Sequence, residues 1–166
     1  MGKSQASLAE RARFRVHGVV LKAKGFGLSL MPIRDTKLLE GEGAVLDLAK
    51  SIANSTFKKA LIVTTAGTVK RGYAEDLEAS LEEQGIACAI FSDVTPDPLF
   101  SIVTAGITKA KQSGCDCVIA LGGGSVIDAA KAIVVGATND QPVEKLIGLR
   151  KGKNKPLPLF AIPTTS

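Results

Sequence analysis

Three consecutive glycines followed by a serine are the residues of this sequence best suited to bind a ligand. They lie in the stretch VIALGGGSVIDAAKAIV, residues 118–134, between an apolar run and a predicted helix. Because Gly122, Gly123 and Gly124 carry no side chain, a bulky anion could approach their backbone amides. The hydroxyl of Ser125 and the unpaired N–H groups of a helix N-terminus would add further donors. The pattern therefore predicts a cradle for phosphate.

Two charged residues follow on the same predicted helix. Asp128 lies three residues after Ser125 and could cap the helix, or hold a ribose or substrate hydroxyl. Lys131 lies three residues further, about one turn along the same face. The stretch is neither GxGxxG nor a P-loop, which needs GxxxxGK followed by Ser or Thr. A tight strand-to-helix turn without a ligand is thus the alternative, in which Asp128 only stabilises the helix dipole.

Strands and helices alternate along the chain and would position this turn. Short apolar runs predict strands at 59–65, 86–94, 115–121 and 157–166. Helical spacing predicts helices at 44–53, 70–84, 98–112 and from Ser125 onward, and residues 31–41 are expected to be extended. This alternation is typical of an α/β protein with a doubly wound, parallel, Rossmann-like sheet. Ligands bind such sheets at the carboxyl ends of the strands.

Composition and charge restrict the class of protein and its partners. The 166 residues suit one domain, and no apolar run approaches the roughly 18 residues that span a bilayer. The net charge of +5 comes from residues 1–37, with eight Lys or Arg against two acids, since residues 38–166 carry 13 against 14. The near-neutral body offers no basic face interleaved with aromatics, so nucleic acid is not expected as a partner. The lack of a long apolar run likewise argues against a membrane. Residues 1–26 are interpreted as a flexible basic leader, with a mitochondrial transit segment as the alternative, and residues 27–166 as the folded domain.

The cysteines indicate a reducing compartment. Cys88, Cys115 and Cys117 are odd in number and lie in apolar surroundings, so a disulfide framework is not expected and the cytoplasm is favoured. Cys115 and Cys117 are two apart, which places them on one face of a strand. We interpret them as small core residues, because a metal site would need a nearby histidine.

Several spaced motifs resemble those of the iron-containing alcohol dehydrogenase family, which includes lactaldehyde reductase, butanol dehydrogenases and, more distantly, glycerol dehydrogenase and dehydroquinate synthase. GGGSVIDAAKAI at 122–133 resembles the GGGSxxDxxK motif of this family. Three further similar segments are FKKALIVTTAGTVKRGYAEDLEASLEEQGI at 57–86, FSDVTPDPLFSIVTAGI at 91–107 and KPLPLFAIPTTS at 155–166. Their order and spacing agree with the family over roughly residues 27–166.

The resemblance implies a nucleotide-binding α/β domain followed by a helical domain, with NAD or NADP in the cleft between them. In the family, one Asp and three His of the helical domain hold iron, or zinc in some members. The metal polarises the alcohol oxygen while a hydride passes to the nicotinamide. By position, the resemblance assigns the pyrophosphate to Gly123, Gly124 and Ser125 beside Gly122. It assigns further cofactor contacts to Asp128, near the nicotinamide ribose, and to Lys131, Thr164 and Thr165.

Two positions depart from the family pattern. Many NAD-preferring relatives have Asp at the end of the second strand, where it binds the adenosine ribose, but this chain has Thr65. The carboxylate that would repel a 2′-phosphate is missing. A strict preference for NAD is therefore not expected, and the cofactor is NAD or NADP. Asp97 stands where many relatives have Asn, and it could keep a polar contact to the cofactor.

The histidine content bears on catalysis. His17 is the only histidine, so the metal site of the family cannot be assembled from this chain and no catalytic or metal-binding residue is expected in it. We expect the NAD(P)-binding half of an alcohol dehydrogenase, truncated at Ser166 before the helical domain. The full-length protein would convert alcohols to aldehydes or ketones, whereas this chain alone is expected to be inactive. It is open to homo-oligomerisation. A natural short nucleotide-binding or interaction module without catalysis is the alternative. A glycerol dehydrogenase-like or dehydroquinate synthase-like member is a further one.

Overall fold

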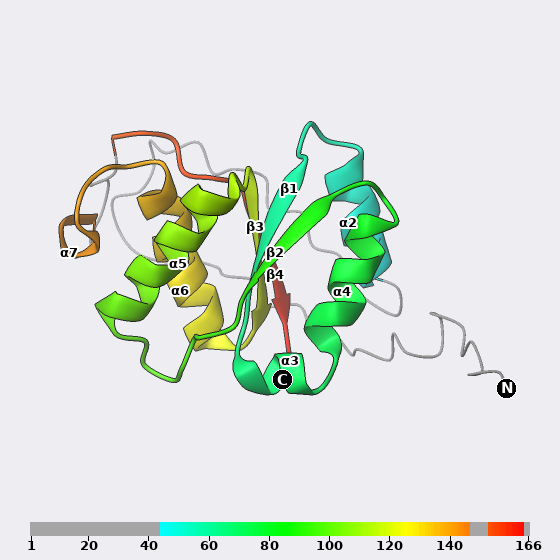
Figure 1. Ribbon diagram of the computed structural model, residues 1–166, viewed down its shortest axis with the longest axis horizontal. Helices are drawn as coiled ribbons and strands as arrows, with labels where there is room; N and C mark the ends of the chain where they lie inside the picture. Colours follow the sequence, from blue (N-terminus) through cyan, green and yellow to red (C-terminus); the bar gives the residue numbers. More distant parts are fainter. Residues whose placement is uncertain (1–43, 147–152, 165–166) are drawn as a thin grey trace, which may run out of the picture.

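A computed structural model describes residues 44–146 and 153–164 of the chain. They form a four-stranded, wholly parallel sheet in the order β2-β1-β3-β4, with helices on both faces (Figure 1). The strands are β1 (Lys59–Val63), β2 (Ala87–Phe91), β3 (Cys117–Gly122) and β4 (Leu159–Pro163). This arrangement confirms the predicted α/β class and the doubly wound parallel sheet.

Four longer helices cover the sheet, two on each face. Helices α2 (Ala44–Ala53) and α4 (Tyr73–Glu82) pack on one face, and α5 (Phe100–Ser113) and α6 (Gly124–Ala137) on the other (Figure 1). Two short helices, α3 (Ala66–Lys70) and α7 (Val143–Leu146), complete the described elements. Strand β3 is buried along its whole length, as expected for a central parallel strand covered on both faces.

Two glycines bring α5 and α6 close together on their face of the sheet. A Cβ atom at Gly106 of α5 would collide with Ile133 of α6, and a Cβ atom at Gly136 of α6 would collide with Ile107 of α5. The contact is therefore reciprocal, because each helix contributes one glycine and one isoleucine to it. Neither glycine has a positive φ, so both are required by packing and not by backbone conformation.

Several element boundaries differ from those expected from the sequence. The helix predicted at 70–84 begins only at Tyr73, because Gly72, with a φ of +81°, interrupts the helical backbone between α3 and α4. Gly85 and Gly114 have the positive φ expected of residues that end a helix. The strands are shorter than predicted, because pairing ends at Val63, Phe91 and Pro163, before the polar residues that the predicted strands included. The leader, the boundary after residue 26 and the extended segment at 31–41 lie outside the described residues.

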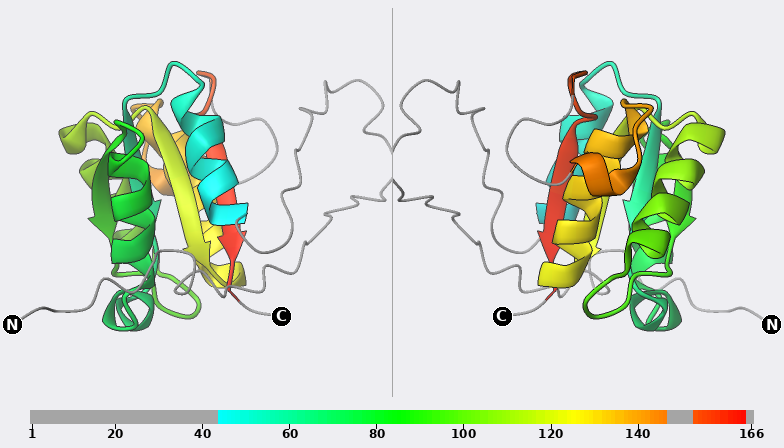
Figure 2. Two further views of the ribbon diagram at one scale, coloured as in Figure 1. Left: turned by 90° about the vertical axis from the view of Figure 1, so that its right-hand side faces the viewer. Right: turned by 90° about the vertical axis from the view of Figure 1, so that its left-hand side faces the viewer.

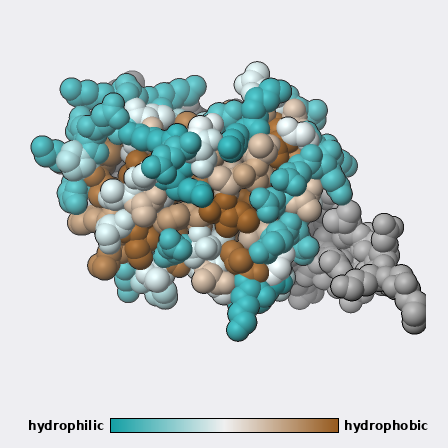
Figure 3. All heavy atoms as spheres, viewed as in Figure 1, coloured by the Kyte–Doolittle hydropathy of each residue, from teal (hydrophilic) through white to brown (hydrophobic). Residues whose placement is uncertain are grey.

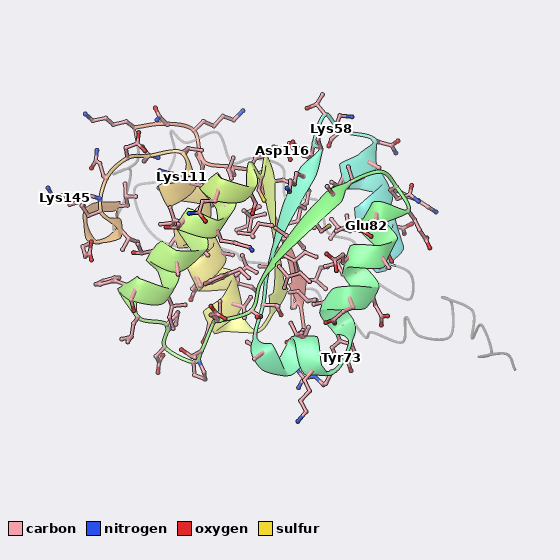
Figure 4. The ribbon with its side chains drawn as sticks, in the orientation of Figure 1. Lys58, Tyr73, Glu82, Lys111, Asp116 and Lys145 are labelled. Carbon is pink, nitrogen blue, oxygen red and sulfur yellow. The ribbon has the colours of Figure 1, made fainter. Side chains whose placement is uncertain are left out.

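Hydrogen bonds close the amino edge of the sheet. The Asp116 carboxylate accepts from the backbone N–H groups of Lys58, at 2.7 Å, and Lys59, at 3.1 Å. The buried Asn139 side-chain oxygen likewise accepts from the backbone of Lys153 at 2.8 Å and Asn154 at 3.1 Å. Figure 4 shows Lys58 and Asp116 together at this edge, at the opposite end of the strands from Tyr73. The Asp116 and Asn139 side chains therefore stabilise the fold by bonding to backbone N–H groups.

The cysteines lie in both cores and not on one face. Cys117 belongs to the core beneath α2 and α4, and Cys88 packs against that core, whereas Cys115 packs against the core beneath α5 and α6. The prediction that Cys115 and Cys117 share a strand face is wrong, because β3 begins only at Cys117. Burial raises the pKa of the Cys88 and Cys117 thiols to about 12 and also raises the pKa of Cys115. All three thiols are free.

Apolar surface follows the edge strand β2. In Figure 3, hydrophobic residues gather in the middle of the viewed face, where β2 runs between α4 and α5 in Figure 1. Most side chains of β2 are only half-buried, since no strand pairs with its outer side among the described residues. Next to this strand, Leu99 and Phe100 at the start of α5 are 69% and 48% exposed.

Candidate functional site

The carboxyl edge of the sheet brings together segments that are far apart in the sequence. Figure 2 shows α3 and the first turn of α6 just beyond the arrowheads of the strands. The Thr64 hydroxyl at the end of β1 donates to the Leu121 carbonyl of β3 at 2.7 Å. The backbone N–H of Thr164, after β4, donates to the Gly122 carbonyl at 3.3 Å. Three strand ends are therefore fixed around the glycine turn.

The three glycines of the turn have different structural roles. A Cβ atom at Gly122 would lie 2.7 Å from Val126 Cγ2 and 3.0 Å from Val126 Cβ, so packing requires a glycine there. Gly123 is the extended residue that precedes α6. Gly124 is the exposed first residue of α6, and a Cβ atom there would meet nothing within 4 Å. The space beside Gly124 is thus open to a ligand.

The first two N–H groups of α6 have no partner among the described residues. Val126 N–H and Ile127 N–H both donate to the Gly123 carbonyl at 3.1 Å. The N–H groups of Gly124 and Ser125 donate to no described residue, and no side chain caps the helix. Free donors at the start of a 14-residue helix are suited to an anion. Residues 122–125 lie at the start of α6, which begins at Gly124 and not at Ser125, and their role as donors to a ligand stays a prediction.

Asp128 and Lys131 interact with each other. Asp128 Oδ1 lies 2.9 Å from Lys131 Nζ, and both side chains are largely exposed. Asp128 is the fifth residue of α6 and lies outside its first turn, so the suggestion that it caps the helix is wrong. An exposed i,i+3 pair of this kind contributes little to stability. Both side chains are therefore on α6, after the glycine turn, and either can leave this ion pair to bind a ligand at little cost in stability.

Thr65 has a structural role that the sequence analysis missed. It is the residue before α3, and its Oγ1 accepts a hydrogen bond from the backbone N–H of Thr68 at 3.2 Å. Its hydroxyl also lies 3.0 Å from the hydroxyl of the buried Thr68. The signal was present in the sequence, since Thr is favoured as a helix N-cap. Thr65 is only half-buried, so its hydroxyl also reaches the carboxyl edge.

Asp97 is separate from the residues gathered at the turn. It lies in the loop between β2 and α5, is exposed, and has a φ of +49°. Asp and Asn tolerate this left-handed backbone better than most residues. The preference for either residue here thus has a conformational explanation, and Asp97 bonds to none of the other described site residues. Thr165 lies outside the described residues.

The described part of the chain contains neither a metal site nor a membrane span. Within residues 44–146 and 153–164, no group of three or more His, Cys, Asp or Glu side chains could hold a metal ion. Over these same ranges, no helix has both the length and the apolar character needed to cross a bilayer. The described residues thus do not fit the iron or zinc site implied by the resemblance, and we derive no step through a metal.

Comparison with known proteins finds a family pattern over most of the chain. The sequence pattern of iron-containing alcohol dehydrogenases matches residues 35–166. Alcohol dehydrogenase 4 of Saccharomyces cerevisiae is 41% identical over 126 residues, which are 76% of this chain and 33% of the yeast protein.

Two solved structures have the same fold over the described region. NADH-dependent butanol dehydrogenase A from Thermotoga maritima superposes with a TM-score of 0.66 at 32% identity, over 73% of this chain and 31% of its own. Sulfoacetaldehyde reductase from Bifidobacterium kashiwanohense, solved in complex with NAD+, gives 0.67 at 28% identity, over 75% and 33%. The chain thus spans about a third of the length of the relatives that it matches.

Proposed function

The chain belongs to the iron-containing alcohol dehydrogenase family, and from this premise we propose that it forms the NAD(P)-binding part of an alcohol dehydrogenase. The observation that supports this most directly is the turn before α6. Two amides there have no partner among the described residues, and they belong to a turn where packing leaves open space beside Gly124. A pyrophosphate supplies the negative charge and the acceptor oxygens that such a turn can bind.

We assign the following roles to residues of this chain. The amides of Gly124 and Ser125, with the Ser125 hydroxyl, bind the pyrophosphate, and Gly123 lets it approach. Thr164 is bonded to Gly122 through its backbone and lines the same turn. Asp128 and Lys131 lie one turn further along α6, where they can reach a ribose hydroxyl. Thr165 and Asp97 remain predicted contacts only.

In the complete protein, the bound dinucleotide would accept a hydride as an alcohol becomes an aldehyde or ketone. The residues of this chain bind and orient the cofactor at the edge of the sheet. The described residues offer no metal site, so an added divalent metal is not expected to confer activity on this chain alone. A cytoplasmic location, which the three free thiols favour, stays a prediction.

Calorimetric titration of the chain with NAD+ tests this proposal. We expect binding by the parent chain and its loss in Gly124→Val, because the branched side chain would fill the open space beside the free amides. Ala79→Val introduces the same side chain at an exposed position of α4 and is the matched control, which should bind like the parent. If Gly124→Val folds and binds NAD+ as tightly as the parent, the pyrophosphate does not lie at this turn.

A further inference from the structure

A second open space lies at the carboxyl edge, next to Gly67 in α3. A Cβ atom placed on Gly67 would lie 3.6 Å from Arg71 Nη1 and 3.8 Å from Thr65 Oγ1. A guanidinium group and a hydroxyl therefore flank the same point, which glycine leaves empty. Gly67 and Arg71 are both exposed, so a ligand can reach this point from solvent.

The position of Arg71 is fixed without using its hydrogen-bonding capacity. Its guanidinium carbon lies 5.6 Å from the centre of the Tyr73 ring, a cation–π contact at the junction of α3 and α4, where Figure 4 labels Tyr73. Arg71 forms no ion pair with any residue in the described ranges, where the two ion pairs are Lys111–Asp140 and Lys131–Asp128. The guanidinium is held beside Gly67 with its N–H donors available.

The Thr65 hydroxyl can donate to a ligand while it keeps its role in α3. It accepts from Thr68 N–H, and the Thr68 hydroxyl at 3.0 Å can serve as donor in the bond between the two side chains. The Thr65 proton is then available to an oxygen in the open space. Thr65 also follows β1, next to β3 and its glycine turn in the sheet.

We propose that Arg71 and Thr65, around the open space at Gly67, bind the 2′-phosphate of an NADP-type dinucleotide. The inference rests on the proposed function, which places a dinucleotide at the neighbouring glycine turn. Arginine suits a phosphate because its planar donors match two oxygens at once. The exposed Lys70 adds positive charge, whereas the exposed Asp93, which bridges to Thr65 through the backbone, opposes it.

Fragments of the cofactor isolate this contact from the rest of the dinucleotide. We would titrate the chain calorimetrically with 5′-ADP, with 2′,5′-ADP and with inorganic phosphate. We expect 2′,5′-ADP to bind about fivefold more tightly than 5′-ADP, as one exposed charge-assisted contact would give. Inorganic phosphate should bind far more weakly than either nucleotide, and equal binding of phosphate and 2′,5′-ADP would overturn the proposal as an anion site without nucleotide recognition.

Variants assign the effect to the named residues. Arg71→Ala should remove the advantage of 2′,5′-ADP and leave the affinity for 5′-ADP unchanged, while Arg71→Lys should keep part of it. Lys70→Ala removes the neighbouring cation and should keep most of the advantage. If Lys70→Ala and Arg71→Ala reduce the advantage equally, the overall positive charge of this surface is responsible and not a contact with Arg71. The assignment is then wrong.

Substitutions at Thr65 separate charge from helix capping. Both Asp and Asn are good N-cap residues, so Thr65→Asp and Thr65→Asn should preserve α3. Only Thr65→Asp should weaken 2′,5′-ADP relative to 5′-ADP, because its carboxylate repels the phosphate. Equal binding of the two nucleotides by the parent would overturn this inference but leave the proposed function standing. Binding of neither nucleotide would refute both.

Discussion

Adding one methyl group at Gly122 should destabilise the fold by a predictable amount. The new Cβ atom would lie 2.7 Å from Val126 Cγ2 and 3.0 Å from Val126 Cβ, against the usual 3.5–4.0 Å between carbon atoms. Rotation of the valine about χ1 cannot relieve the contact with its own Cβ, and Val126 is only 2% exposed. Overpacking of this kind costs about 1–3 kcal/mol, and the φ of +158° at Gly122, which residues with a side chain rarely adopt, adds to this cost. We expect a loss of about 1–3 kcal/mol in the free energy of unfolding.

Gly124→Ala is the matched control, two residues away in the same turn. Its Cβ atom would meet nothing within 4 Å, and alanine favours the helix, so its free energy of unfolding should be unchanged or higher by up to about 1 kcal/mol. Urea unfolding followed by far-ultraviolet circular dichroism measures both variants, with the m-value checking that the unfolded state is the same. The packing argument is refuted if Gly122→Ala is as stable as Gly124→Ala.

Two further results are expected. In the native chain, iodoacetamide at pH 8 should modify Cys88 and Cys117 about tenfold to a hundredfold more slowly than a free thiol, because burial raises their pKa to about 12 and leaves little thiolate. Mass spectrometry measures the labelling rate, with the urea-unfolded chain as the control. Labelling of the native chain at the unfolded rate would contradict this prediction. The chain should not oxidise ethanol or propanediol in the presence of NAD+ and added Fe2+ or Zn2+, since the described residues contain no metal cluster; turnover above a metal-free blank would show that the metal ligands had been misjudged.

The order of elements was predictable because the buried strands are short, apolar and separated by glycines. The position of the glycine turn at a strand end followed from the same pattern, and both are found in the structure. The exact ends of the elements depended on tertiary contacts. Pairing stops at Phe91 and Pro163, and the spacing of apolar residues in the sequence does not show where pairing stops. The four-residue helix α7 is too short to produce a periodic signal.

Side-chain roles were less predictable than positions. Gly122, Gly123 and Gly124 look equivalent in the sequence, yet only the structure shows that one of them packs against Val126 and another borders open space. Gly72 lies inside a stretch whose apolar spacing predicts one continuous helix. Only the structure shows its positive φ, which separates α3 from α4. The exposed pair of Asp128 and Lys131 likewise depends on where α6 begins.

The reciprocal contact between α5 and α6 restricts how this sequence can change. Because Gly106 accommodates Ile133 while Gly136 accommodates Ile107, a larger residue at either glycine requires a smaller residue at its isoleucine on the other helix. Each glycine can therefore change only together with the isoleucine that it contacts. The two pairs fix the position of α5 along α6 at two points. In relatives that have a larger residue in place of one of these glycines, we expect a smaller residue in place of the isoleucine that it contacts.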